Sequence, residues 1–125
     1  MPKEAQWERA ARGIDGRDHP WKGGEDDIAL RCNMGGTGIG HTSAAGLFPS
    51  GKAACGAMDM SGNVWEWCED LYQSDQPYRV LRGGSWIHYG LRSLRASYRG
   101  SGDPGSRSCD VGFRVVCVVV GSASG

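Results

Sequence analysis

The sequence of 125 residues has no long hydrophobic run and no excess charge of either sign. No stretch approaches the roughly 20 apolar residues that a membrane-spanning helix needs, so we expect no direct insertion into a membrane. The N-terminus also lacks the basic and then apolar segments of a signal peptide. Because 14 basic residues balance 14 acidic residues, the charge gives no reason to expect nucleic acid as a partner.

Cysteine and histidine are too sparsely placed for a common metal-binding motif. The five cysteines are an odd number and include no CxxC pair, which argues against a zinc ribbon and against a complete disulfide framework. His19, His41 and His88 are widely spaced, so an iron or zinc site is not expected. At most two disulfides could form, and we predict free, buried thiols at Cys32, Cys55, Cys68, Cys109 and Cys117.

Helix-forming segments are scarce, whereas glycine, with 21 residues, is far above its usual share of about 7%. Residues 3–12 are the exception, because Trp7 and Ala11 recur at helical spacing and Gly13 provides a stop. Residues 13–56 are rich in Gly, Asp, Pro, Thr and Ser, a composition typical of loops. So long a connection is unusual in a compact domain unless it is functional or held by a ligand such as a metal.

The second half of the chain contains short runs that are typical of strands. The predicted strands cover residues 64–68, 78–82 and 111–120, with 94–99 as a further candidate. The first run alternates in character and so has two different faces, while the third is rich in β-branched residues. We therefore predict a single α+β domain over residues 1–120, with a small antiparallel sheet, one or two helices and long loops. Residues 121–125 are small and polar, which predicts a flexible tail.

Five blocks of sequence occur in an order that resembles one family. They are Pro2 to Gly13, His19-Pro20-Trp21, Met60 to Trp67, Arg82 to Trp86 and Gly112-Phe113-Arg114. In this order they are similar to the formylglycine-generating-enzyme (sulfatase-modifying factor) family, and they cover most of the chain. The resemblance implies a C-type-lectin-like fold, which agrees with the α+β prediction. The family's first half has no counterpart before Pro2, which implies a minimal or N-terminally shortened version of the fold.

The residues that carry oxidase chemistry in this family are replaced in the chain. The family's oxidase binds copper through two cysteines that follow its Gly-Gly-Ser-aromatic corner, since soft thiolates select Cu(I). The matching positions are His88 and Ser93, and Cys109 lies in another loop without a neighbouring thiol. We therefore predict that the chain binds no copper and is not an enzyme.

A calcium site is better preserved than the copper site. Carried over from the resemblance, its ligands are the side chains of Asp59 and Glu66 and the main-chain carbonyls of Gly62 and Val64. Oxygen ligands suit Ca²⁺, so we predict a structural calcium ion there. The alternative is that Asp59 caps a turn and Glu66 pairs with an arginine. A second family site would combine Asn33 with a later aspartate, which residues 35–42 lack, so we predict its loss.

Fixed and variable positions alternate between Arg82 and Arg114. The segment keeps Gly83 to Trp86, Leu94-Arg95, Asp103-Pro104-Gly105 and Gly112 to Arg114 in an order that resembles one branch of the family, the variable proteins of diversity-generating retroelements. In those systems, adenine-directed mutagenesis rewrites chosen codons, commonly asparagine codons. The resemblance predicts ligand-binding variable positions at Ile87, His88, Tyr89, Leu91, Arg92, Ser93, Tyr98, Gly100, Ser101, Gly102, Ser106, Ser108, Cys109 and Asp110.

The residue types at these positions agree with the genetic code. Changing only the adenines of an AAC codon cannot produce Lys, Met, Gln, Glu or Trp, and none of the predicted variable positions carries one of these types. Tyr, His, Ser, Gly and Asp are also the mixture found in antibody-like binding loops. The alternative is that residues 87–110 form a solvated loop without a function.

The sequence therefore predicts a ligand-binding variable protein of a diversity-generating retroelement, with a protein or a surface glycan as its partner. The resemblance implies display at a cell or virion surface. Two alternatives stay open, namely a formylglycine-generating oxidase-like enzyme and a non-catalytic structural or interaction module of the same family. The arginines concentrated in the last third of the chain are interpreted as structural hydrogen-bond donors.

Overall fold

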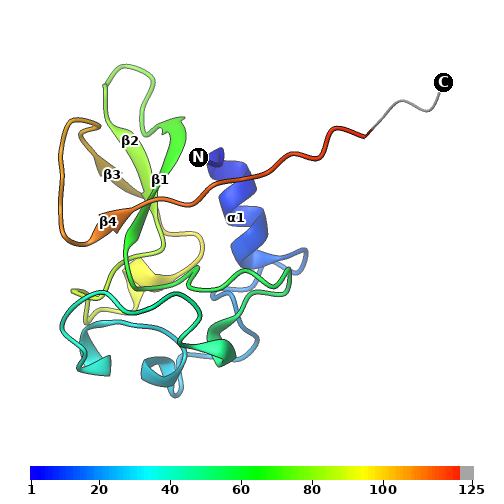
Figure 1. Cartoon of the computed structure of the whole chain (residues 1–125), viewed down its shortest axis with the longest axis vertical. Helices are drawn as coiled ribbons and strands as arrows, with labels where there is room; N and C mark the ends of the chain where they lie inside the picture. Colours follow the sequence, from blue (N-terminus) through cyan, green and yellow to red (C-terminus); the bar gives the residue numbers. More distant parts are fainter. Residues whose placement is uncertain (122–125) are drawn as a thin grey trace.

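The chain folds into one α-helix, a four-stranded sheet and long loops, as a computed structural model that describes residues 1–121 shows (Figure 1). The elements are α1 (Glu4–Arg12), β1 (Trp65–Leu71), β2 (Arg79–Arg82), β3 (Gly100–Gly102) and β4 (Val111–Gly112), with single-turn 3₁₀ helices at Ile28–Leu30, Gly35–Thr37, Pro49–Gly51 and Arg92–Leu94. The predicted α+β class is confirmed. Within the described residues, no helix is long and apolar enough to cross a membrane.

Helix α1 forms where the sequence predicted it. Trp7 and Ala11 lie one turn apart on its buried face, and only 1% and 0% of their surfaces are exposed. At the first turn, the Gln6 side chain accepts a hydrogen bond from the Lys3 backbone N–H at 2.9 Å. The helix ends at Gly13, whose φ of 65° is readily adopted by glycine.

The sheet has the strand order β3-β2-β1-β4. Strand β2 pairs antiparallel with both β1 and β3. Strand β4 instead pairs parallel with β1, so the sheet is mixed and the prediction of an antiparallel sheet was wrong. The loop 103–110 carries the chain from the β3 edge to the opposite edge (Figure 1). Because β3 and β1 are both antiparallel to β2, strands β3, β1 and β4 all run in the same direction.

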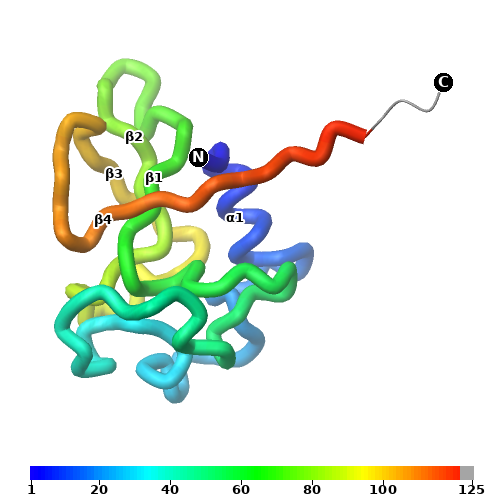
Figure 2. Tube along the Cα trace, viewed as in Figure 1, coloured from blue at the N-terminus to red at the C-terminus, as the bar shows by residue number. Residues whose placement is uncertain are grey.

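Two of the predicted strands differ from the observed structure. In the predicted strand 111–120, only Val111 and Gly112 pair with β1; beyond them the described chain leads away from the body (Figure 2), with Val115 76% and Val120 87% exposed. Its β-branched composition suits a strand but supplies no partner. The predicted strand 94–99 was also wrong, because Arg95 N–H bonds Arg92 O and closes a 3₁₀ turn there.

The apolar core consists of two clusters that together fasten the long loop. The first cluster lies between α1 and the sheet and contains Trp7, Met60, Cys68 and Val80. The second is built largely from residues 21–34 of the loop-rich segment, with Trp21, Ile28, Cys32, Met34 and Leu94 as its buried members. The segment 13–56 is thus held in place by its apolar residues, which anchor it beside the sheet.

All five cysteines are free thiols, as predicted, but only two are buried. Cys32 and Cys68 lie in the core, and burial raises the pKa of each thiol to about 12. The prediction of burial was wrong for Cys55, Cys109 and Cys117, which are exposed because they lie in loops or in the unpaired segment after β4. The predicted tail 121–125 falls outside the described residues except for Gly121.

Candidate functional site

Strand β1 separates the two groups of predicted site residues on its opposite faces. Glu66 and Cys68 point to the buried side, while Trp65 and Trp67 alternate with them and are partly exposed. The predicted calcium ligands therefore lie on the Glu66 side. The predicted variable residues gather near the two tryptophans.

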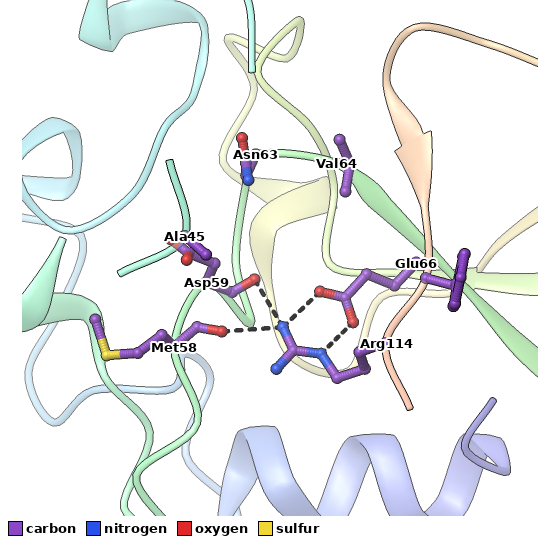
Figure 3. A pocket seen from close by; sticks show the side chains of 8 residues that line it. Ala45, Met58, Asp59, Asn63, Val64, Glu66 and Arg114 are labelled. Atoms are coloured by element: carbon purple, nitrogen blue, oxygen red, sulfur yellow. Dashed lines mark hydrogen bonds and ion pairs between the residues drawn. The ribbon is translucent and has the colours of Figure 1, made fainter. Parts of the chain in front are cut away.

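The carboxylate of Glu66 is bound by an arginine of the chain. Arg114 Nε lies 2.6 Å from Glu66 Oε2, and Arg114 Nη2 lies 2.6 Å from Oε1, a bidentate pair that Figure 3 shows. Arg114 Nη2 also donates to the carbonyls of Met58 at 2.9 Å and Asp59 at 3.2 Å. From the other side, Trp7 Nε1 donates to Glu66 Oε2 at 2.7 Å.

A cavity of about 350 Å³ brings part of the predicted calcium site together. Asp59, Val64 and Glu66 line it along with Arg114 (Figure 3). The Asp59 carboxylate accepts a hydrogen bond from Gly46 N–H at 2.8 Å, and Gly62 is placed where a Cβ would lie 2.4 Å from Asn33 O. Asp59 thus fastens a turn and Glu66 pairs with an arginine.

Arg114 would compete with a calcium ion at Glu66. A divalent cation that binds both carboxylate oxygens would have to displace the Arg114 guanidinium, because each oxygen already accepts a hydrogen bond from it. Calcium binding by Asp59, Gly62, Val64 and Glu66 stays a prediction. Among residues 1–121, no group of three or more His, Cys, Asp and Glu side chains is placed to hold a metal ion.

Asn33, the residue predicted from a second family site, organises the neighbouring loop. It is completely buried, and its Nδ2 donates to His41 O at 2.8 Å. Asn63 completes the arrangement, since its Oδ1 accepts from Ser43 N–H at 2.9 Å. The two amides hold residues 41–43 against the turn that precedes β1.

Trp65 contacts three of the predicted variable residues, namely His88, Tyr98 and Gly100, and this role of Trp65 was not predicted. Its Nε1 donates to His88 Nε2 at 2.9 Å, and the two rings meet edge to face at 5.2 Å. Tyr98 lies 6.0 Å from Trp65 between ring centroids. A Cβ at Gly100 would lie 3.1 Å from the same indole. Two separate parts of the segment 87–110, at residue 88 and at residues 98–100, therefore share one aromatic support.

The side chains of Ile87 and Tyr89, on either side of His88 in the chain, form an exposed rim of this region. Tyr89 is 77% exposed and Ile87 is 44% exposed. These two residues and Trp86 border a hollow of about 310 Å³ whose other wall is the glycine-rich loop 35–40. His88 O accepts a hydrogen bond from Gly35 N–H at 2.7 Å, which fixes the two walls relative to each other. Five further predicted variable residues are exposed, namely Arg92, Ser101, Ser106, Ser108 and Cys109.

Three predicted variable positions have structural roles instead. Asp110 accepts hydrogen bonds from Ser85 Oγ at 2.9 Å and from Ser108 Oγ, and its carbonyl accepts from Trp65 N–H. Leu91 packs against the second core cluster. A Cβ at Gly102 would lie 2.7 Å from the Trp67 ring and 3.0 Å from a Leu81 methyl. The predicted set is therefore not uniformly available to a ligand.

The two positions matched to the family's copper cysteines are also placed by the structure. His88 is held by Trp65 through its Nε2. The Ser93 hydroxyl donates to Gly90 O at 3.4 Å within the turn that leads to Arg92–Leu94. Each of these two side chains is therefore engaged with its own surroundings.

Curated relatives of the chain include proteins named as enzymes and proteins named as inactive. Hercynine oxygenase of Mycolicibacterium thermoresistibile is 34% identical, over 92% of this chain and 31% of its own length. The formylglycine-generating enzyme of Streptomyces coelicolor is 33% identical, over 91% and 45%. The inactive C-alpha-formylglycine-generating enzyme 2 of Bos taurus is 36% identical, over 91% and 42%. The chain thus spans from about a third to less than half of the length of these relatives.

Solved structures with the same fold include a variable protein. Treponema denticola variable protein 1 superposes with a TM-score of 0.80 at 27% identity, over 90% of this chain and 45% of that protein. PvdO from Pseudomonas aeruginosa superposes with a TM-score of 0.76 at 28% identity, over 90% and 50%. The loop-rich α+β arrangement is therefore the C-type-lectin-like fold that the sequence predicted.

The relatives correct the prediction that the chain is not an enzyme. Relatives at 34% and 33% identity are named hercynine oxygenase and formylglycine-generating enzyme, which are enzymes. The prediction was wrong because His88 and Ser93 test only the copper cysteines of one activity. A family with several named activities is not excluded from catalysis by the loss of one ligand pair.

The family itself is shown by the extent of the match. The family described as "Sulfatase-modifying factor enzyme 1-like domain" matches residues 1–119, which is nearly all of the described chain. The match includes the five blocks that first suggested the resemblance, which is confirmed. The chain belongs to the family of sulfatase-modifying factor enzyme 1-like domains.

Proposed function

We propose that the chain is a ligand-binding variable protein of a diversity-generating retroelement, with its recognition surface in residues 87–110. The observation that carries the proposal is the arrangement around Trp65, where His88, Tyr98 and Gly100 meet from different parts of that segment. The similarity to Treponema denticola variable protein 1 supports it, at a TM-score of 0.80. The ligand class is a protein or a surface glycan.

The chemistry of the rim suits recognition. Tyr89, with 77% of its surface exposed, offers a large and rigid contact area at a low cost in side-chain entropy. Ser101 and Ser106 are exposed polar residues of the same segment, whose hydroxyl groups can both donate and accept hydrogen bonds. Trp65 and Trp67 belong to β1, outside the segment 87–110, so substitutions at exposed positions such as Tyr89 leave this aromatic support in place.

The binding part of the proposal is tested with tyrosine variants on arrays of purified surface proteins and of glycans. We expect at least one target to be bound, and Tyr89→Ala to weaken that binding by about tenfold or more, the loss of a central aromatic contact. Tyr78→Ala is the matched control, since Tyr78 is 41% exposed and belongs to the β1–β2 connection. Equal binding by Tyr89→Ala and the native protein would overturn the proposal.

The retroelement part of the proposal is tested on the DNA. A near-repeat of codons 82–114 that differs only at adenines, beside a reverse-transcriptase gene, is the expected observation. A genomic neighbourhood with neither feature would contradict the retroelement assignment and leave ligand binding to be judged by the arrays alone.

A second candidate function comes from the relatives named as oxygenase and formylglycine-generating enzyme. Its test is incubation of the full chain with a cysteine-containing sulfatase peptide, copper, oxygen and a thiol reductant that supplies the two further electrons for the reduction of O₂, followed by mass spectrometry. Conversion of the peptide cysteine to formylglycine would establish this activity. An unchanged peptide would contradict the formylglycine-generating activity for this chain.

A further inference from the structure

A basic hollow of about 450 Å³ lies next to the group formed by Trp65, His88 and Tyr98, and Tyr98 belongs to both. Its wall is made of three arginines, two tyrosines and a serine, namely Tyr72, Arg92, Arg95, Ser97, Tyr98 and Arg99, and no acidic residue lines it. The chain as a whole carries no net charge. The positive charge at this place is therefore a local concentration, which attracts anions over a short range.

One of the three arginines is held by the fold. Arg99 donates to both carboxylate oxygens of Glu4, at 2.6 and 3.1 Å, and its guanidinium lies 4.8 Å from the Tyr72 ring centroid. Glu4 is shared with Arg82, whose Nη1 lies 2.6 Å from the same oxygen. Arg82 also pairs with Glu8 at 3.3 Å, so Arg99 is neutralised within this network of charges, and the positive charge left in the hollow comes from Arg92 and Arg95.

The other two arginines have donors to offer. Arg92 lies 5.9 Å over the ring of Tyr98, and within residues 1–121 its guanidinium makes no hydrogen bond to another side chain or to the backbone. Arg95 Nη2 forms an ion pair with Glu25 Oε1 at 3.7 Å, beyond hydrogen-bonding distance, and the Arg95 side chain is 50% exposed, so its N–H groups can still donate to a ligand. A cation–π contact with a tyrosine leaves the N–H groups at the edge of a guanidinium free to bind an oxyanion.

The surrounding groups narrow the ligand class. A guanidinium edge binds a carboxylate or a sulfate with two parallel hydrogen bonds. The hydroxyl groups of Ser97, Tyr72 and Tyr98 belong to the same hollow and can both donate and accept, as sugar hydroxyls require. A ligand that carries an oxyanion and several hydroxyl groups on one compact ring uses both sets of groups.

We propose that this hollow binds an acidic glycan through a carboxylate or sulfate group placed between Arg92 and Arg95. The proposal rests on the binding function assigned above and names its ligand class. It differs from the interpretation of the clustered arginines as structural donors. That interpretation holds for Arg99 and Arg114, which bind Glu4 and Glu66, and it does not describe Arg92 and Arg95.

The test compares the native chain with Arg92→Ala/Arg95→Ala by calorimetric titration. The probes are a heparin-derived sulfated hexasaccharide, the uncharged maltohexaose, polyglutamate and a single-stranded oligonucleotide. Arg9→Ala/Lys52→Ala is the matched control, because it removes the same charge from two exposed positions outside the hollow. Circular dichroism confirms that each variant is folded.

We expect the native chain and the control to bind the sulfated hexasaccharide alike, with no binding of maltohexaose. The double variant should bind it at least about tenfold more weakly, the loss of two charge-assisted contacts. Equal affinity in the double variant, or tighter binding of polyglutamate or the oligonucleotide than of the hexasaccharide, would overturn the proposal. A Tyr89-dependent target on the arrays together with no hexasaccharide binding refutes the glycan proposal alone and leaves the proposed function standing.

Discussion

Replacement of Arg114 by methionine is the sharpest test of how the buried side of β1 is held. The substitution keeps much of the apolar stem and removes the guanidinium that binds Glu66 with two contacts of 2.6 Å. It leaves Trp7 Nε1, at 2.7 Å, as the remaining side-chain donor to this carboxylate. Glu66 is 5% exposed, so water can compensate little of the lost charge partner.

The magnitude follows from the burial of the two side chains. Removing one partner of a fully buried ion pair costs about 3–5 kcal/mol. The Arg114 side chain is 29% exposed and that of Glu66 is 6% exposed, so the lower end of that range applies, at about 3 kcal/mol of unfolding free energy. For a domain of this size such a loss lowers Tm by about 10 °C.

Urea unfolding of four proteins provides the assay, namely the native chain, Arg114→Met, Glu66→Gln and the double variant. We expect the sum of the two losses of unfolding free energy in the single variants to exceed the loss in the double variant by about 2 kcal/mol, since each single change breaks the same ion pair. Arg9→Met, an exposed arginine, should stay within about 0.5 kcal/mol of the native chain. A cost of less than about 1 kcal/mol for Arg114→Met, or additive single costs, would refute the argument.

The thiols, the β3 glycines and the calcium site each give a further test. At about pH 8, Ellman's reagent should modify three of the five thiols, since burial raises the pKa of Cys32 and Cys68 to about 12. Reaction of all five thiols in the folded protein would contradict this burial. The neutral thiols of Cys32 and Cys68 contribute fully to the stability of the fold below about pH 9, and this contribution is lost as the pH rises towards about 12. Thermal melts over this pH range should therefore show a falling Tm. Gly102→Ala should cost about 1–3 kcal/mol through overpacking and Ser101→Ala less than about 0.5 kcal/mol, and equal urea midpoints would contradict this. Arg114→Met should bind Ca²⁺ about tenfold more tightly than the native chain in calorimetry, and equal affinities would contradict the competition for Glu66.

The parts of the fold that were predicted correctly depend on neighbours along the chain. The spacing of Trp7 and Ala11 and the stop at Gly13 locate α1 to within one residue. The alternation in residues 64–68 likewise located β1, although the strand continues to Leu71. These elements could be predicted because the residues whose spacing indicates them lie within one or two turns of the same element.

The parts that were missed depend on distant partners. Strand β4 has two residues and exists only because Val111 and Gly112 lie against Trp65 and Glu66. A β-branched run predicts the capacity for a strand, and pairing decides its length. The direction of β4 depends on where the preceding loop crosses the sheet, for which composition carries no signal.

The candidate site shows the same division. The alternative that Glu66 pairs with an arginine was open from the sequence, yet Arg114 lies 48 residues away along the chain and no spacing rule connects them. A signal for Trp65 did exist, since the alternation of its strand places Trp65 and Trp67 together on the face opposite Glu66. Two neighbouring aromatic residues on one exposed face predict a supporting surface.

The pleat of β3 limits how much change this surface can accept. Gly100 and Gly102 face Trp65 and Trp67, where a Cβ would lie 3.1 and 2.7 Å from the rings, whereas Ser101 between them is exposed. Random replacement of all three residues would therefore yield folded proteins mainly when the outer two remain small. Under the diversification proposed above, the sequence variation that leaves the protein folded is therefore concentrated at exposed positions such as Ser101 and Tyr89, and β3 contributes little of it through Gly100 and Gly102.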